Sequence, residues 1–206
     1  MKLTADELLT GMPNIGQRLS IFLEPLNAAM EEFEINTYSR MAMFLAQVAH
    51  ESGELRYMEE IWGPTDAQRT YDKRADLGNT EENAIRIAAL HGSTPGYWWR
   101  GRSPIQTTGY TNYLLTGNAL GLDLLNHPEL IGLPKDGCRA AAYFFKSRGL
   151  NTVADKDDEN AFKVCTHRVN GGVLTYDKEG NAILKYANHY EERKAFWIRF
   201  QEALGA

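Results

Sequence analysis

The chain has 206 residues, of which 43% are hydrophobic and 24% are charged, and its formal net charge is −5. This size and composition predict one folded domain with a real hydrophobic core and argue against disorder. Phosphate backbones bind to clustered positive charge, and the sequence has no basic tail and no Lys/Arg run. We therefore expect no nucleic acid among its partners.

The N-terminal part of the chain predicts three helical segments. Residues 4–11 open with a Thr-x-x-Glu capping box, which starts a helix. Residues 15–35 have a helical pattern but contain Pro25, which predicts two short helices or a kink. The clearest helix covers residues 37–53, because apolar side chains recur there at three- and four-residue steps between a Thr and a Gly. The first residues carry acids and no long apolar run, so we expect no signal peptide.

Farther along the chain, helical patterns alternate with polar or glycine-rich segments. We expect helices at about residues 80–92, 110–120, 135–148, 157–168 and 185–204. Residues 65–79 and 92–113 are predicted to be irregular, and two Gly/Asn turn signals in residues 169–184 predict a small hairpin. The sequence therefore predicts a mainly α-helical fold with a few short strands at most.

The cysteines and the hydropathy argue against two classes of protein, those held by disulfides and those that span a membrane. Cys138 and Cys165 lie in apolar helical contexts, which predicts two buried thiols rather than a disulfide. No window approaches the about 18 apolar residues that a membrane span requires. We expect a protein that is made in the cytoplasm and does not insert into a membrane.

Glu51 is an acid at an unusual position. It lies in the last turn of the helix predicted over residues 37–53, at the edge of the buried face. The negative end of the helix dipole and partial burial both disfavour an ionised carboxyl there. A general acid needs such a place, because it must hold its proton near neutral pH. Alternatively, Glu51 turns to solvent and pairs with Arg56 or Lys73, and the pattern does not decide between the two.

A zinc site is the alternative interpretation of residues 50–54. His50 and Glu51 begin the zinc motif H-E-x-x-H, but position 54 is a glutamate, and the other histidines have no ligand spacing. We therefore expect no metal and no cofactor, and a zinc amidase is disfavoured.

The acids that follow Glu51 are candidate partners for it. Glu54 falls at the helix exit, and Glu59 and Glu60 point to opposite sides if residues 55–62 form a strand or an extended arm. The pattern alone does not choose between Glu59 and Glu60. A pair of acids across a cleft is typical of glycosidic hydrolysis, in which one protonates the leaving oxygen and the other activates water or attacks.

The irregular segment 92–113 combines aromatic and polar side chains in the way that sugar sites do. The aromatic rings of Tyr97, Trp98 and Trp99 offer apolar faces, and Gln106, Thr107, Thr108, Asn112 and Tyr113 offer hydrogen bonds to hydroxyl and acetamido groups. The alternative is an aromatic cluster that only packs the lobe.

The order of these motifs resembles the glycoside hydrolase family 19 chitinases, and more closely their phage and prophage endolysin branch. The motifs are A-H-E-S-G at 49–53, Glu60, G-R-S-P-I-Q-T-T at 101–108, N-Y at 112–113 and R-V-N-G-G at 168–172. The resemblance spans nearly the whole chain. It implies a two-lobed, lysozyme-like fold in one catalytic domain, residues 1–206, with a small lobe at roughly residues 55–100 and no separate wall-binding domain.

The resemblance also implies roles for single residues. Glu51 matches the general acid, Glu60 the second acid, and Thr108 the residue that helps to hold the catalytic water. The substrate-binding positions are matched by Gln106, Asn112, Tyr113 and Asn170, to which we add Trp99 from the aromatic segment, and Arg193 matches the arginine that neutralises the acid pair. Ser103 departs from the family, which has a glycine there; a positive φ at this position would cost stability.

Taken together, the resemblance implies an endolysin that cuts β-1,4 bonds between N-acetylated amino sugars of peptidoglycan glycan strands. Inversion at the anomeric carbon predicts carboxyl groups about 6.5–9.5 Å apart. We expect a monomer that stays in the host cytoplasm until a holin or another export route releases it to the wall. The alternatives are a chitinase acting on poly-N-acetylglucosamine and a non-catalytic wall-binding protein with a decayed site, for which Ser103 is the hint.

Overall fold

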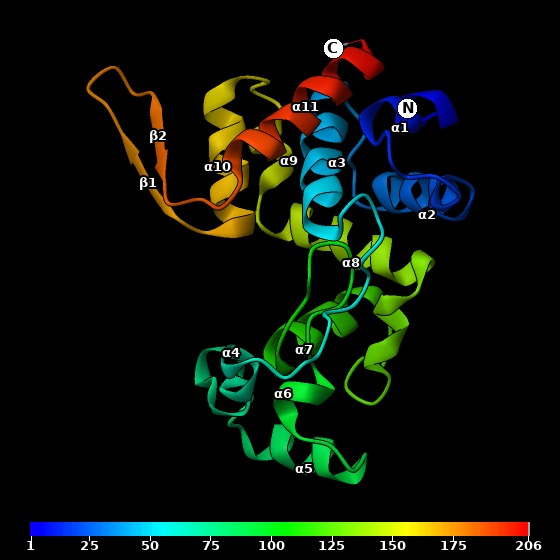
Figure 1. The fold of residues 1–206 in the computed structure, drawn as a ribbon, viewed down its shortest axis with the longest axis vertical. Coiled ribbons are helices and arrows are strands. Elements are labelled where there is room, and N and C mark those ends of the chain that lie inside the picture. Colours follow the sequence, from blue (N-terminus) through cyan, green and yellow to red (C-terminus); the bar gives the residue numbers. More distant parts are fainter. Residues whose placement is uncertain (206) are drawn as a thin grey trace.

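Two groups of helices lie at opposite ends of an elongated molecule in the computed structural model, which describes residues 1–205 (Figure 1). The large lobe holds α1 (Ala5–Gly11), α2 (Arg18–Glu32), α3 (Tyr38–Ser52), α8 (Pro134–Ser147), α9 (Leu150–Ala154), α10 (Glu159–Asn170) and α11 (Tyr190–Leu204). The small lobe is built around α4 (Asp66–Arg69), the 3-10 turns η1 (Tyr71–Lys73) and η2 (Ala75–Leu77), α5 (Glu82–Leu90) and α6 (Pro95–Trp98). Between them lie α7 (Tyr110–Leu120) and η3 (Pro128–Gly132).

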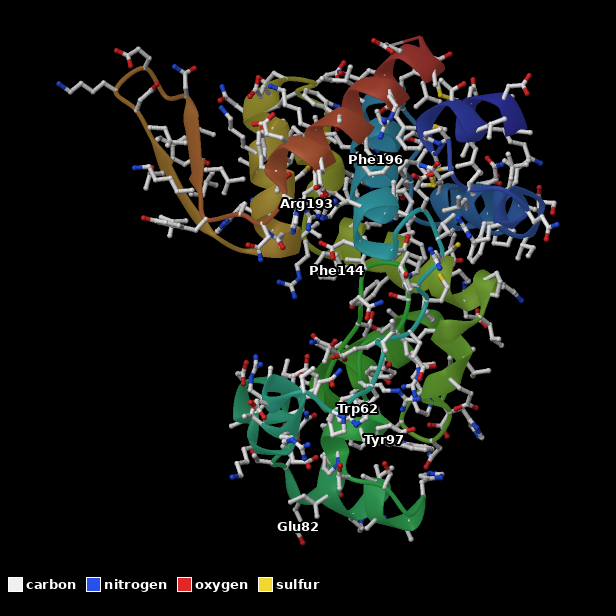
Figure 2. All side chains as sticks on the ribbon, viewed as in Figure 1. Trp62, Glu82, Tyr97, Phe144, Arg193 and Phe196 are labelled. Atoms are coloured by element: carbon white, nitrogen blue, oxygen red, sulfur yellow. The ribbon has the colours of Figure 1, made fainter. Side chains whose placement is uncertain are left out.

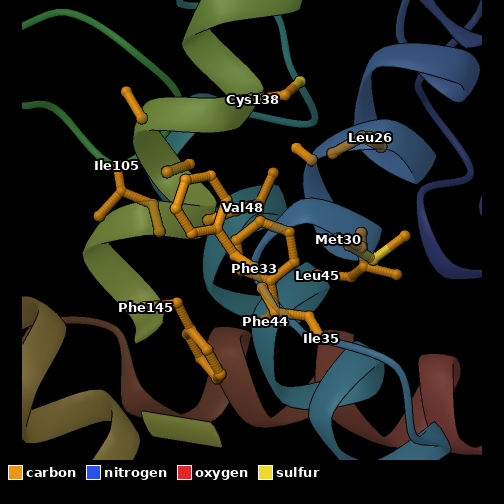
Figure 3. Packing of buried hydrophobic residues seen from close by; sticks show 14 of the residues in the cluster. Leu26, Met30, Phe33, Ile35, Phe44, Leu45, Val48, Ile105, Cys138 and Phe145 are labelled. Carbon is orange, nitrogen blue, oxygen red and sulfur yellow. The ribbon is translucent and has the colours of Figure 1, made fainter. Parts of the chain in front are cut away.

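Helix α3 forms the centre of the large lobe, and its ends follow the sequence prediction. Thr37 Oγ1 accepts a hydrogen bond from the main-chain N–H of Arg40 at 3.3 Å, and Gly53 ends the helix in the left-handed conformation at φ 56°. Residues 41–49 are all buried, because α3 packs against α8, α9, α10 and α11. Figure 3 shows Phe44, Leu45 and Val48 in the core that results.

Helix α2 continues through Pro25, so the predicted break into two helices is wrong. Proline removes one main-chain N–H and crowds the carbonyl four residues earlier, which here belongs to Ile21. The Ile21 side chain is 52% exposed, so this surface of the helix faces water, which can bind the freed carbonyl. Leu26 and Met30 are buried beyond the proline and hold the second half of the helix on the core.

The C-terminal segments show one confirmed prediction and one displaced boundary. Strands β1 (Val173–Tyr176) and β2 (Ala182–Lys185) form the predicted hairpin, antiparallel with Val173 opposite Lys185. The end of the hairpin next to its turn is held to α10, because the main-chain N–H of Ala182 donates to Asn160 Oδ1 at 2.8 Å. Because residues 182–185 pair in this hairpin, α11 begins at Tyr190 and not near residue 185.

The structure also describes the two cysteines, the segment of residues 65–79 and the apolarity of the helices. Cys138 and Cys165 are free and buried as predicted, and burial raises the pKa of each thiol. Residues 65–79, predicted to be irregular, contain α4 and two 3-10 turns. Among residues 1–205, no helix is both long and apolar enough to cross a bilayer.

Helix α1 supports the position of α11 through one close contact. A Cβ atom on Gly11 would lie 2.0 Å from the ring of Phe200, whose side chain is fully buried. Helix α11 packs in turn along α3. The missing side chain at Gly11 therefore sets how closely α1 approaches α11.

The substitution Gly11→Ala should lower the free energy of unfolding by about 1–3 kcal/mol, because the new methyl group overlaps the Phe200 ring and the core must shift. Thr10→Ala, on the exposed side of the same helix, is the matched control and should change stability little. Chemical denaturation of the three proteins measures the effect. Equal midpoints for Gly11→Ala and the wild type would contradict this account of the packing.

Candidate active site

Two predicted acids, Glu51 and Glu60, line one cleft. Glu51 is in the last turn of α3, and Glu60 lies in the segment that leads from α3 into the small lobe. The cleft has a volume of about 270 Å³ and is lined by Glu51, Tyr57, Glu59, Glu60, Ile61 and Gln106. The structure therefore brings together the acids that the family resemblance selected.

Glu51 is held by a buried arginine from the other end of the chain. Arg193, on α11 and labelled in Figure 2, is 2% exposed. Its Nη2 donates to Glu51 Oε1 at 2.5 Å, its Nη1 to Gln47 Oε1 at 2.7 Å, and its Nε to the main-chain carbonyl of Asn188 at 3.3 Å. Gln47 donates in turn to Thr166 Oγ1 at 3.1 Å. The guanidinium is thus fixed on three sides.

This contact changes the sequence-based account of Glu51. Pairing with Arg56 or Lys73 is wrong, since the partner is Arg193. The Arg193 guanidinium is buried and lies against the Glu51 carboxyl as its ion-pair partner. Glu51 is therefore a carboxyl placed against a fixed cation, and not an acid isolated in an apolar wall.

Glu60 has different surroundings, made of uncharged donors. Its Oε1 accepts from Gln68 Nε2 at 2.9 Å and from the Tyr71 hydroxyl at 3.2 Å, and its Oε2 accepts from the main-chain N–H of Gly101 at 3.0 Å. Burial and the Glu60 carboxylate raise the pKa of Tyr71, which therefore stays a donor. These three hydrogen bonds stabilise a carboxylate at Glu60.

Sequence reasoning missed both side chains that orient Glu60. Gln68 also caps α4: its Oε1 accepts from the main-chain N–H of Thr65 at 2.8 Å while its Nε2 reaches Glu60. The capping box T-D-A-Q at residues 65–68 was the available signal for α4. Nothing in the sequence indicated that the remaining donor of Gln68, or the hydroxyl of Tyr71, would meet Glu60.

Glu59 lines the same cleft but is engaged elsewhere. Its carboxylate forms ion pairs with Arg100 and Arg102, the second at 3.4 Å from Nε. A single antiparallel bridge joins Glu59 to Arg102; residues 55 and 56 form a turn, and the segment that follows belongs to no sheet. The geometry therefore leaves Glu60, and not Glu59, as the acid that has hydrogen-bond donors around it and, within residues 1–205, no cation paired to it.

Gly101 lets three polar side chains converge beside the cleft. A Cβ atom on Gly101 would lie 2.4 Å from Gln106 Oε1, 3.2 Å from Thr108 Oγ1 and 3.3 Å from Glu60 Oε2. Thr108 Oγ1 donates to the main-chain carbonyl of Gln106 at 3.0 Å, and Asn112 Nδ2 donates to the carbonyl of Thr108 at 2.7 Å. Four of the predicted site residues, Glu60, Gln106, Thr108 and Asn112, are therefore neighbours.

Ser103 adopts the positive φ that its departure from the family glycine suggested. Its φ is 72° and its side chain is fully buried. The left-handed conformation costs a non-glycine residue about 1–2 kcal/mol. The main-chain N–H of Ser103 donates to the carbonyl of Met58 at 3.0 Å, which helps to hold the residue in place. The loop thus keeps its shape with serine.

Two predicted substrate contacts, Trp99 and Tyr113, are wrong. Both side chains are fully buried. The Trp99 ring packs against Tyr110 with centroids 5.0 Å apart, and the Tyr113 hydroxyl donates to the carbonyl of Arg100 at 2.7 Å. Both side chains support the loop from inside. Trp99 belongs to the loop itself, and Tyr113 belongs to the adjacent helix α7. The packing alternative therefore holds for these two aromatics.

Other aromatic side chains lie at the surface of the small lobe near Glu60. Trp62 packs edge-on against Tyr97 and Tyr71, with centroids 5.3 and 5.8 Å apart (Figure 2). Arg100 stacks over Tyr97 at 4.2 Å. Asn170 ends α10, and its Nδ2 is buried with no hydrogen-bond partner among the residues described. No trio of His, Cys, Asp or Glu within residues 1–205 has an arrangement that could hold a metal ion.

Comparison with known protein families identifies the class of protein. The family model for glycoside hydrolase family 19, described as chitinase class I, matches residues 31–148, which is more than half of the chain. The chain therefore belongs to glycoside hydrolase family 19. The match includes both acids of the cleft and the loop from Gly101 to Thr108.

Curated relatives are plant enzymes that are longer than this chain. Endochitinase At2g43590 of Arabidopsis thaliana is 38% identical over 157 residues, which are 75% of this chain and 52% of the relative. Endochitinase At2g43620 of the same plant is 30% identical over 152 residues, 74% of this chain and 46% of the relative. The chain thus spans about half the length of the curated relatives that it matches.

Solved structures confirm the predicted fold. Chitinase C from Streptomyces griseus HUT6037 superposes with a TM-score of 0.70 at 20% identity, over 98% of this chain and 76% of the other. A bacterial family 19 chitinase superposes with a TM-score of 0.71 at 21% identity, over 98% and 95%. The chain therefore has the mainly α-helical, lysozyme-like fold of this family.

The substitution Arg193→Lys should lower the free energy of unfolding by about 1–3 kcal/mol. A single ammonium cannot reproduce the three directed hydrogen bonds to Glu51, Gln47 and Asn188. Arg199→Lys, in the same helix, is the matched control, because Arg199 stacks on Phe196 and forms no ion pair in the part of the chain described. Denaturant unfolding compares the variants. A loss for Arg193→Lys no greater than for the control would contradict the proposed anchoring.

His50, next to Glu51, makes stability depend on pH. Burial lowers its pKa from 6.5 to about 4, aided by the positive charge of Arg193. The unfolded chain therefore binds a proton at His50 near pH 6.5, before the folded protein does, and stability falls as pH drops from 6.5 toward 4. His50→Gln should lose less melting temperature than the wild type between pH 7 and pH 5. His127→Gln, at an exposed histidine, is the control and should behave as wild type; identical losses in all three proteins would contradict this assignment.

Proposed function

We propose that this chain hydrolyses β-1,4 glycosidic bonds between N-acetylated amino sugars and that its substrate is the glycan of bacterial peptidoglycan. The observation that carries the proposal is the placement of two carboxylates, Glu51 and Glu60, in the wall of one cleft. Membership of glycoside hydrolase family 19 supports the class of reaction. A pair of carboxyl groups across a cleft supplies the acid and the base of most glycosidases.

Glu51 and Glu60 have different surroundings, which suit them to different roles in the reaction. Glu60 is a carboxylate stabilised by neutral donors, which suits a general base that takes a proton from water. Thr108 uses its own proton on the carbonyl of Gln106, so its hydroxyl oxygen is free to accept a hydrogen bond from that water. The water then attacks the anomeric carbon from the face opposite the leaving group, which inverts its configuration.

Glu51 is the proton donor in this scheme. When Glu51 transfers its proton to the leaving oxygen, it becomes a carboxylate. Arg193 stabilises the negative charge that forms, because its guanidinium is already fixed in contact with Oε1.

Peptidoglycan and chitin are the two candidate substrates. The resemblance of residues 49–53, 101–108 and 168–172 to the endolysin branch supports peptidoglycan, whereas the printed names of the curated relatives support chitin. Under the first proposal the protein is a phage-type endolysin, acts as a monomer and stays in the host cytoplasm until it is released to the wall. A binding protein with a decayed site has less support, because both acids keep ordered polar partners.

Glu51→Gln and Glu60→Gln should each reduce the release of reducing ends from purified peptidoglycan by at least about 100-fold, because each removes one proton-transfer group. Glu59→Gln is the matched control from the same cleft. It should keep most of the activity, since Glu59 is engaged by two arginines. Melting temperatures of all variants separate loss of catalysis from loss of fold.

Full activity in Glu51→Gln or Glu60→Gln would contradict the two-carboxylate assignment, and a loss confined to Glu59→Gln would reassign the base. The same assay on chitin oligosaccharides decides the substrate. Reducing ends released from chitin, with none from peptidoglycan, would favour the chitinase candidate over the endolysin.

A further inference from the structure

A second hollow adjoins the cleft of the two acids. It has a volume of about 160 Å³, and Gln106 lines both it and the acid cleft. Its lining includes the polar side chains of Thr108 and Asn112. Phe144, near the C-terminal end of α8, and Arg148, the residue that follows this helix, also line it. A glycan strand that passes the acids and follows Gln106 would therefore place its next ring against α8.

Arg148 is a cation without an anionic partner at the rim of this hollow. Its side chain is exposed, and its guanidinium stacks over the ring of Phe144 at 5.0 Å. The main-chain carbonyl of Arg148 accepts from Nη1 of Arg168 at 2.8 Å, and the Arg168 side chain lines a separate hollow with Lys156 and Asp158. Within residues 1–205, no carboxylate lies within 4.0 Å of either side chain.

Other arginines within residues 1–205, such as Arg86 and Arg199, also form no ion pair, but Arg148 is the arginine that lines this hollow. The chain has 27 acidic and 22 basic side chains, and the nearby arginines of the large lobe, Arg40 and Arg139, each form ion pairs. Stacking on Phe144 holds the planar group of Arg148 in a fixed orientation at the rim, where it is ready to bind an anion from outside the chain. An arginine fork binds a carboxylate through two parallel hydrogen bonds.

We propose that Arg148 binds a carboxylate of the substrate one ring away from the cleaved bond, and that this contact makes the enzyme prefer anionic amino-sugar strands to neutral ones. The inference rests on the proposed glycosidase function. Peptidoglycan supplies such a carboxylate from its stem peptide, or from the lactyl group of its muramyl ring once the stem is removed. A chain of N-acetylglucosamine alone has no anionic group.

The test compares Arg148→Gln with the wild type on three substrates made from one preparation. These are intact peptidoglycan, peptidoglycan freed of stem peptides by an amidase, and peptidoglycan whose carboxylates have been converted to neutral amides. Initial rates of reducing-end release give kcat/KM on each. Arg148→Lys keeps the charge without the fork, and Arg86→Gln removes an exposed arginine from α5 in the small lobe.

Arg148→Gln should lose about tenfold in kcat/KM on strands that carry a carboxylate, the size expected for one charge-assisted hydrogen-bonded contact. It should match the wild type on the amidated strands. Arg148→Lys should recover part of the loss, and Arg86→Gln should show none. A loss on intact strands alone identifies the stem-peptide carboxylate, and a loss on amidase-treated strands identifies the lactyl group.

Two results would overturn the inference while the proposed function stands. These are equal activity of Arg148→Gln and the wild type on every substrate, and an equal loss on charged and amidated strands, which would mean that Arg148 only supports the fold. A wild type that is inactive on all three substrates would instead overturn the proposed function and the inference together.

Discussion

The buried guanidinium of Arg193 is the constraint on which the rest of the site depends. A charge removed from water must be paired and hydrogen-bonded, and removing its partner is strongly destabilising. Two of its acceptors, Gln47 and Glu51, are four residues apart on α3 and therefore share one face of that helix. Satisfying Arg193 thus fixes the rotation of α3 against α11, and it sets the position of Glu51 at the cleft. Thr166 extends the same network to α10.

The second acid is positioned by independent means. Glu60 belongs to the arm that enters the small lobe, and its donors Gln68, Tyr71 and Gly101 are all in or next to that lobe. The two carboxylates are therefore attached to different parts of the molecule, one by a buried ion pair and the other by neutral hydrogen bonds. This division gives them unlike chemistry, which an acid and a base of one reaction require. It also means that the spacing between them depends on how the lobes are joined.

The sequence was sufficient where local chemistry decides the structure. The capping of the helix at 37–53 and the hairpin in 169–184 were predicted, because caps and turn residues act within a few positions. It was insufficient where distant segments meet. The partner of Glu51 is 142 positions away, and the pattern gave no means of finding it without the family resemblance. Trp99 and Tyr113 were predicted as substrate contacts from their residue type and from the family resemblance, whereas the direction of each side chain is set by tertiary packing.

In the proposed reaction, Glu60 activates a water molecule while Glu51 protonates the leaving oxygen. The most direct test is the configuration of the newly formed reducing end, followed by proton NMR in the first minutes of hydrolysis of peptidoglycan strands, before mutarotation mixes the anomers. Attack by water on the face opposite the leaving group predicts that β-1,4 bonds yield the α-anomer first. Initial release of the β-anomer would show net retention through a covalent or substrate-assisted route, and would contradict the role assigned to Glu60.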